Sequence, residues 1–148
     1  MAGSGMRIEG GCHCGNIAFT LDWDGEPEEI PARACDCSFC VKHGGVWTSS
    51  PGGQLQVRIA DAGAHQEYAF GTGTARFHVC RRCGVVPVVS SEIDGSTYAV
   101  VSVNALEGID RSRLKMTTAN FGDEDVATRL QRRTRGWIAH VEFVGRTA

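Results

Sequence analysis

The sequence predicts a mainly β protein built from many short strands in one domain. Nineteen glycines divide the 148 residues into short segments, because glycine favours turns. Apolar and polar residues alternate within several of these segments, as they do in strands with one buried face. The length suits a single domain with a real hydrophobic core. We therefore expect residues 7–148 to form one domain, preceded by a flexible lead over residues 1–6.

The alternation is clearest over residues 16–23 and 54–59. In the first segment Ile17, Phe19 and Leu21 fall on one face, and the second has a similar repeat. Further strands are expected at residues 67–70, 76–79, 85–90, 97–103 and 137–144.

A tight turn, a strand that contains a proline and one helix complete the expected elements. Asp94-Gly95 is typical of a tight turn between two strands. Pro87 cannot donate a backbone hydrogen bond, so its strand is expected to be an edge strand or to contain a bulge. Residues 123–133 are acidic at the start and basic at the end, which favours a helix.

Overall charge does not point to nucleic acid or to a membrane as partner. The net charge is −2, and both partners usually require a basic excess. No apolar run approaches the length of a membrane span, and the first residues lack the features of a signal peptide. We therefore expect a cytoplasmic protein, in which closely spaced cysteines are metal ligands or reactive thiols and not disulfides.

The seven cysteines form three clusters. Zinc takes four ligands in closed structural sites, whereas catalytic sites leave one position open, so seven thiols divide naturally into four and three. A glycine directly follows the last cysteine of the first and third clusters, where a tight turn around a thiolate needs a flexible backbone. This pattern predicts a closed zinc site made by Cys12, Cys14, Cys80 and Cys83.

The middle cluster, Cys35, Cys37 and Cys40, is then left as an open site. Three local thiolates can hold a second zinc ion and leave a position for a substrate thiol, which the metal would deprotonate. Occupancy of this second site can be lower than that of the first, because an open site loses metal or oxidises more readily.

Other interpretations of the cysteines remain open from spacing alone. Cys37 and Cys40 could join Cys80 and Cys83 in a zinc ribbon, or the thiols could form disulfides or a redox pair. Three histidines also lie near the clusters as alternative ligands, although packed or exposed side chains are the simpler interpretation: His13, His43 and His78. Four basic residues could balance thiolate charge or attract an acidic substrate: Arg33, Lys42, Arg81 and Arg82.

The ordered motifs resemble those of one known family. Cys12-His13-Cys14-Gly15, then Cys35-Asp36-Cys37-Ser38-Phe39-Cys40, then Cys80-Arg81-Arg82-Cys83-Gly84 are similar to the glutathione-dependent formaldehyde-activating enzymes, also called the centromere protein V/GFA domain. The resemblance implies a Mss4-like (β-tent) fold of short antiparallel strands with a minor C-terminal helix, stabilised by zinc. Asp36 occupies a position where histidine is common in the family.

The resemblance also implies an activity. It indicates a carbon–sulfur lyase of the S-(hydroxymethyl)glutathione synthase type, with zinc as cofactor and a small thiol such as glutathione and a small aldehyde as partners. On this hypothesis Cys35, Cys37 and Cys40 hold the catalytic metal. The alternative is a non-catalytic zinc module, such as a carrier, a sensor or a protein-interaction domain, because fold alone does not fix function.

Overall fold

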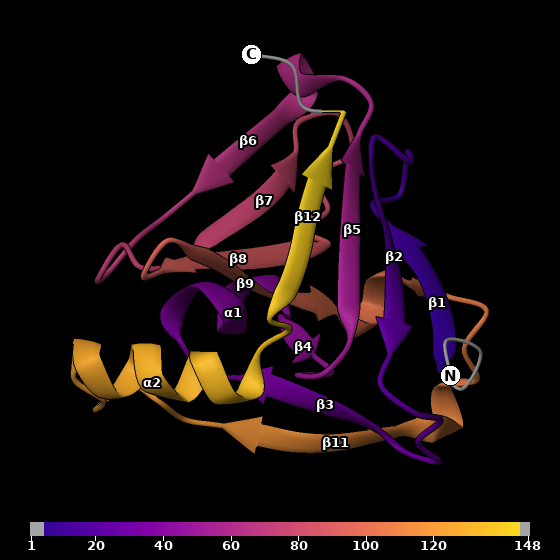
Figure 1. Ribbon diagram of the computed structural model, residues 1–148. Coiled ribbons are helices and arrows are strands. Elements are labelled where there is room, and N and C mark those ends of the chain that lie inside the picture. Colours follow the sequence, from indigo (N-terminus) through magenta and orange to yellow (C-terminus); the bar gives the residue numbers. More distant parts are fainter. Residues whose placement is uncertain (1–4, 146–148) are drawn as a thin grey trace.

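Two β-sheets meet to form a tent-like outline in the computed structural model, which describes residues 5–145 (Figure 1). The first sheet has five strands in the order β10-β1-β2-β5-β12, and the second has seven in the order β11-β3-β4-β9-β8-β7-β6. The mainly β class with a minor C-terminal helix is confirmed. The expected lead over residues 1–6 lies mostly outside the described residues, and β1 begins at Met6.

The strands of the first sheet are β1 (Met6–Gly11), β2 (Ile17–Trp23), β5 (Gln54–Ile59), β10 (Leu106–Glu107) and β12 (His140–Val144). Those of the second sheet are β3 (Ile30–Cys35), β4 (Val46–Thr48), β6 (His65–Tyr68), β7 (Arg76–Cys80), β8 (Val88–Ile93), β9 (Ser96–Ser102) and β11 (Leu114–Ala119). The α-helices are α1 (Ser38–His43) and α2 (Val126–Gly136), with short 3₁₀ turns at η2 (Ala62–Ala64), η3 (Val103–Ala105) and η4 (Arg111–Arg113).

Most neighbouring strands are antiparallel, but two pairs are parallel. β12 runs parallel to β5, and β11 runs parallel to β3. Each of these pairs includes a strand from the C-terminal part of the chain that joins the outer edge of a sheet. The expectation of antiparallel strands therefore holds within the body of each sheet and is wrong at these two edges.

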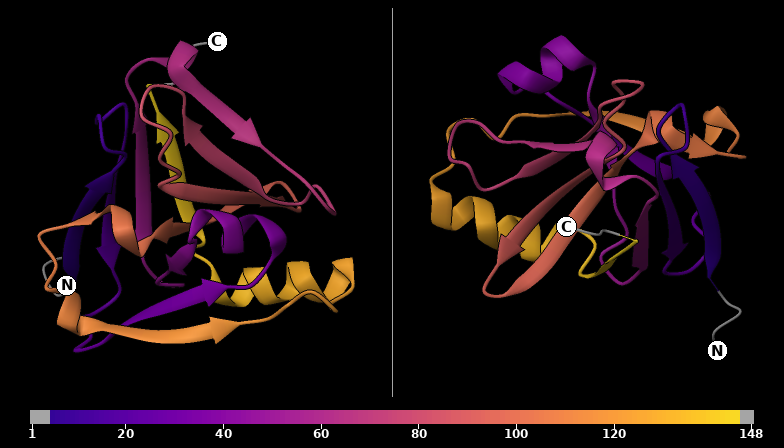
Figure 2. Two further views of the ribbon diagram at one scale, coloured as in Figure 1. Left: turned by 180° about the vertical axis from the view of Figure 1, so that it is seen from behind. Right: turned by 90° about the horizontal axis from the view of Figure 1, so that it is seen from above.

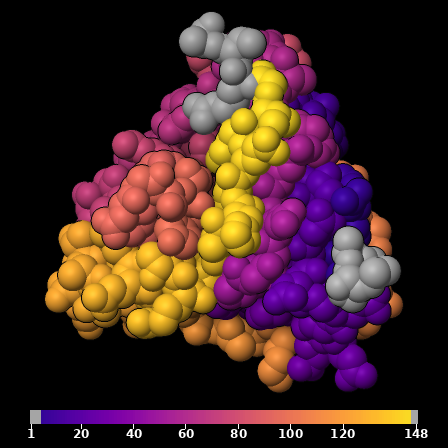
Figure 3. Space-filling view, in the orientation of Figure 1, coloured from indigo at the N-terminus to yellow at the C-terminus, as the bar shows by residue number. Residues whose placement is uncertain are grey.

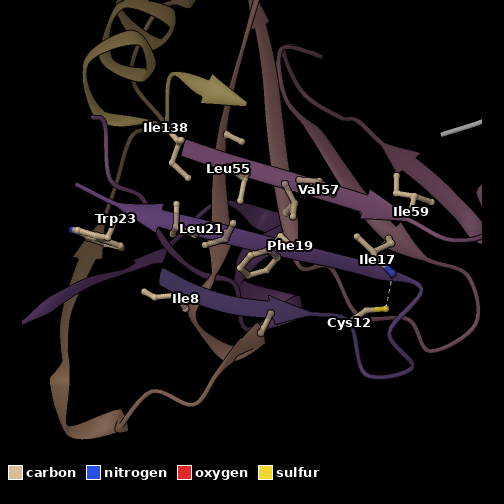
Figure 4. Close-up of a cluster of buried hydrophobic side chains, with 14 of the residues drawn as sticks. Ile8, Cys12, Ile17, Phe19, Leu21, Trp23, Leu55, Val57, Ile59 and Ile138 are labelled. Carbon is tan, nitrogen blue, oxygen red and sulfur yellow. Dashed lines mark hydrogen bonds between the residues drawn. The ribbon is translucent and has the colours of Figure 1, made fainter. Parts of the chain in front are cut away.

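The main core lies between the sheets and follows the predicted alternation. Every second residue of β2 is buried, as are Leu55, Val57 and Ile59 of β5. Figure 4 shows these side chains along two neighbouring strands, with Cys12 close to Ile17. The backbone N–H of Ile17 donates to the Cys12 thiol at 3.3 Å, so the first cysteine turn is attached directly to the core.

Some sequence-based boundaries were wrong. The strand expected at 67–70 is β6, two residues earlier, and the helix expected at 123–133 begins at Val126. The helix starts later because the Asp125 carboxylate caps it, accepting from the N–H of Thr128. The strand expected from Trp137 begins at His140, after Ile138 has paired with Ala99 of β9.

The prediction from Pro87 was also wrong. β8 starts just after the proline and lies between β7 and β9, so it is an interior strand. Pro87 contributes only its carbonyl, which accepts from the N–H of Ser102 at 2.9 Å. The expected turn at Asp94-Gly95 is present, with positive φ at both residues, and joins β8 to β9.

A second, smaller core cluster fills the space beside α1. Its buried members are Cys40, Trp47, Phe77, Val86, Val89 and Val100. Views from behind and from above show that α1 and α2 are two separate helices (Figure 2). In the space-filling view, α2 and β12 form a continuous part of one face (Figure 3).

Candidate metal centres

The structure brings Cys12, Cys14, Cys80 and Cys83 together, with all four sulfur atoms within 4.8 Å of one another. The Cys12 and Cys14 sulfurs are 3.8 Å apart, and those of Cys14 and Cys80 are 3.5 Å apart. Four thiolates bound tetrahedrally to zinc at about 2.3 Å would have sulfur atoms about 3.8 Å apart. The donor set and its spacing therefore fit a zinc ion.

Two tight turns present these thiols. Gly15 donates its N–H to the carbonyl of Cys12, and Gly84 donates to the carbonyl of Cys80 at 2.8 Å. Both glycines have positive φ, 87° and 79°, a conformation that other residues adopt only with strain. The glycine that follows each cysteine pair is therefore explained by backbone geometry.

The surroundings of Cys12 and Cys83 shift their pKa values in opposite directions. Burial raises the pKa of Cys12 to about 11. Burial would also raise the pKa of Cys83, but hydrogen bonds to its sulfur from Val85 and Cys14 backbone N–H groups and from neighbouring thiols lower it to about 6. This cluster thus holds at least one thiolate at neutral pH and is prepared to bind a cation.

The second group consists of Cys35, Cys37 and Cys40, whose sulfur atoms also lie within 4.8 Å of one another. Cys35 ends β3, and Cys37 caps the N-terminus of α1, where its sulfur accepts from the N–H of Cys40. Residues 38–43, which the sequence did not predict as a helix, place Cys40 beside the other two thiols.

Close packing fixes Cys40. The indole N–H of Trp47 donates to its sulfur at 3.3 Å. A Cβ at Gly45 would lie 3.0 Å from the same sulfur and from the Trp47 ring, so any larger residue would crowd the thiol. Only glycine leaves this side of the cluster undistorted.

A hydrogen bond between Cys35 and Cys40, two members of this three-thiol group, shifts their pKa values in opposite directions. The hydrogen bond from Cys40 is the largest influence that lowers the pKa of Cys35, which is about 6. The same bond and burial raise the pKa of Cys40. Three converging sulfurs, one of them a thiolate at neutral pH, suit a thiophilic cation and leave its fourth position to another ligand.

The alternative groupings are not formed. Cys37 and Cys40 lie in a different group from Cys80 and Cys83, so the thiols do not make a zinc ribbon. All seven cysteines are unbridged. The seven sulfur atoms thus fall into one group of four and one group of three, as expected from the sequence.

None of the three histidines singled out from the sequence belongs to either thiol group. His13 is exposed, and His43 stacks on Phe39 with ring centroids 5.2 Å apart. His78 is buried, and its ring nitrogens lie 2.9 Å from His65 and 2.7 Å from Ser90. His65, Glu67 and His78 form a third group with metal-binding side chains, which the sequence analysis missed because it depends on the pairing of β6 with β7.

A cavity of about 450 Å³ opens beside the three-thiol group. The cavity is lined by the three cysteines of this group, by Asp36 and by aromatic side chains. Four arginines complete the lining: Arg33, Arg129, Arg132 and Arg133. Of the basic residues singled out from the sequence, Arg33 is the one that reaches this cavity, whereas Arg82 pairs with Asp61 at 2.6 Å. The α2 arginines were missed because only tertiary packing brings them here.

Comparisons with known proteins identify a family and a similar solved structure. A family model described as glutathione-dependent formaldehyde-activating enzyme matches residues 7–123. A crystal structure of a Rhodobacter sphaeroides protein is similar, with 29% sequence identity, a TM-score of 0.55, and coverage of 74% of this chain and 99% of the other. Between residues 5 and 145, no helix is long and apolar enough to cross a membrane.

Proposed function

This chain belongs to the family of glutathione-dependent formaldehyde-activating enzymes, and from that premise we propose that it is a zinc-dependent carbon–sulfur lyase of the S-(hydroxymethyl)glutathione synthase type. It would add a small thiol to formaldehyde or a related aldehyde. The observation that carries this proposal is the convergence of Cys35, Cys37 and Cys40 on a cavity large enough for a small molecule.

The two thiol groups would have different roles. Cys12, Cys14, Cys80 and Cys83 hold a structural zinc ion, and the trio holds the catalytic one. Zinc bound by three thiolates would favour the deprotonated form of a substrate thiol at neutral pH. The remaining contributions come from the residues around the cavity.

The reaction needs no redox partner. The substrate thiol loses its proton, and a sulfur electron pair forms a bond to the aldehyde carbon. The C=O π electrons move to the oxygen, which takes up a proton, so the hemithioacetal contains every atom of both reactants. Asp36 is exposed and lines the same cavity, and we assign it to accepting the thiol proton.

The cavity walls support the trio in this role. Trp47 and Gly45 hold Cys40 in place, and Phe70 and Phe77 limit access of water. Holding thiol and aldehyde together in a confined space lowers the entropic part of the barrier. Thiols also add to formaldehyde without a catalyst, so the protein's contribution is measured as a rate above that background.

The test is hemithioacetal exchange measured by NMR in mixtures of glutathione and formaldehyde, with zinc per chain determined by elemental analysis. We expect exchange above the uncatalysed rate, in proportion to protein concentration. Cys35→Ser should return exchange to the uncatalysed rate, whereas Val41→Ser, an exposed change on α1, should not. A fully zinc-loaded protein without any rate enhancement would instead identify a non-catalytic zinc module.

A further inference from the structure

Four arginines line the cavity beside the three thiols, and three of them, Arg33, Arg129 and Arg133, have no salt bridge within the described residues 5–145. Arg133 is only 6% exposed, and its guanidinium donates to the Thr74 carbonyl, the Thr74 hydroxyl and the Ser91 hydroxyl, all of them neutral groups. Arg33 donates to the Ser49 hydroxyl at 2.8 Å. Buried charges in proteins are normally paired, and neither guanidinium has a carboxylate in direct contact, although Glu124 and Cys35 act on Arg133 at longer range.

The neighbouring arginines show the same imbalance. Arg129 donates to the backbone carbonyls of Phe121 and Glu124. Of the four arginines around the cavity, Arg132 is the one with an ion pair in the described residues 5–145, through two bonds of 2.9 Å to Glu124. The Nε atoms of Arg129 and Arg133 are buried without a hydrogen-bond partner, so both guanidiniums retain unused donors.

Much of the rest of the wall is apolar, although Asp36, Ser38, Thr72 and Thr74 also line it. Phe70, Phe77, Val89 and Val100 line the cavity, and so does Trp137, whose ring lies 4.8 Å from the Arg133 guanidinium carbon. A fully polar ligand would lose water against these side chains without gaining hydrogen bonds. The wall instead favours a ligand that has an apolar body and a single anionic group.

We propose that this cavity binds a thiol with an apolar body and an anionic group, a carboxylate or an equivalent oxyanion, which Arg33, Arg129 and Arg133 hold. The thiol part of this inference rests on the proposed function; the anion and apolar parts do not. Arg129 and Arg133 lie in α2, beyond the residues 7–123 matched by the family model, so the family match does not account for them.

The first experiment uses probes without a thiol, so it does not depend on catalysis. 4-Phenylbutanoate and 4-phenylbutan-1-ol share one apolar body and differ in charge. Binding to the zinc-loaded protein is followed by tryptophan fluorescence, since Trp47 and Trp137 line the cavity. We expect the acid to bind about tenfold more tightly, as a charge-assisted hydrogen bond allows. Equal affinities would overturn the inference.

Variants locate the anion. Arg129→Met is expected to remove most of the preference for the acid, whereas Arg135→Met, a matched change at an exposed position of the same helix, should retain it. Arg133→Lys, which keeps the charge, should retain more of it than Arg133→Met, and circular dichroism checks that each variant is folded. Identical preferences in Arg129→Met and Arg135→Met would contradict the assignment.

A second experiment separates this inference from the proposed function. Hemithioacetal exchange is measured with 4-(mercaptomethyl)benzoate, benzyl mercaptan and glutathione. We expect enhancement in the order acid, neutral thiol, tripeptide. Enhancement without preference for the acid would refute the inference and leave the lyase intact. Selective binding of the acid probes without any exchange would refute the lyase and leave the anion site intact.

Discussion

Cys80 and Cys35 carry the same thiol in very different surroundings. Cys80 is fully buried within the main core, whereas Cys35 is half-buried and lines the cavity. We expect Cys80→Ser to lose the zinc of the four-thiol group and at least about 3 kcal/mol of stability, because it leaves buried ligands without their counter-charge. Cys35→Ser should lose one zinc ion and about 1 kcal/mol or less. Elemental analysis and urea unfolding measure both, and equal losses of metal and stability would refute the assignment of structural and catalytic sites.

Gly84 shows how a single backbone angle supports the metal site. A Cβ would meet no atom within 4 Å, so its positive φ of 79° alone makes the glycine necessary. Gly84→Ala is therefore expected to cost about 1–2 kcal/mol in unfolding free energy. Gly136→Ala is the matched control: a Cβ there also meets nothing within 4 Å, but its φ is not positive, so the change should be neutral or stabilising. A similar cost at both positions would mean that φ is not the cause.

At the scale of elements, the segment from α2 to β12 joins the two sheets. Ile138 is fully buried, and it exchanges backbone hydrogen bonds of 2.9 and 3.1 Å with Ala99 of β9 before the chain enters β12. We expect Ile138→Ala to cost about 2–5 kcal/mol and Ile138→Val about 1 kcal/mol, as in other buried sites. Thermal and urea unfolding test this expectation. A loss below that of Val141→Ala, a half-buried position on β12, would show that the junction does not stabilise the fold.

Elements whose formation depends on local pattern were predictable from the sequence. β2 and β5 alternate strictly and were found within one residue of their bounds. β3, β11 and the six-residue α1 were missed, because each is held by its neighbours and not by its own periodicity. Pro87 misled the analysis because a proline just before a strand removes no ladder hydrogen bond.

The same distinction applies to the site. Both cysteine groups could be predicted because the spacing of the thiols and the positions of Gly15 and Gly84 can be read directly from the sequence. The anionic preference could not, since Arg129 and Arg133 face the thiols only after α2 has packed beside the second sheet. In the sequence, Arg133 belongs to an ordinary basic helix end, and Arg129 lies about one turn earlier in the same helix.

At the scale of the whole molecule, the four-thiol group joins distant parts of the chain. Cys14 and Cys80 are 66 residues apart, and the metal would fix a contact that costs considerable loop entropy. The main core nevertheless includes Phe19, Leu21 and Val57, whose apolar side chains are not metal ligands. A bound metal ion would therefore add to the stability that the apolar core supplies, although Cys12 and Cys80 belong to both.

Removing the metal should separate these two contributions. A strong chelator is expected to lower the midpoint of thermal unfolding without unfolding the protein at 25 °C, because the core remains buried. Hydrogen exchange should increase first in residues 12–17 and 80–85, where the thiol turns lie, while β2 and β5 stay protected. The Cys35→Ser variant is the control and should show the same change, since its four-thiol group is intact. Simultaneous exchange of all strands on chelation would show instead that the fold depends on zinc as a whole, and that the hydrophobic core alone is insufficient.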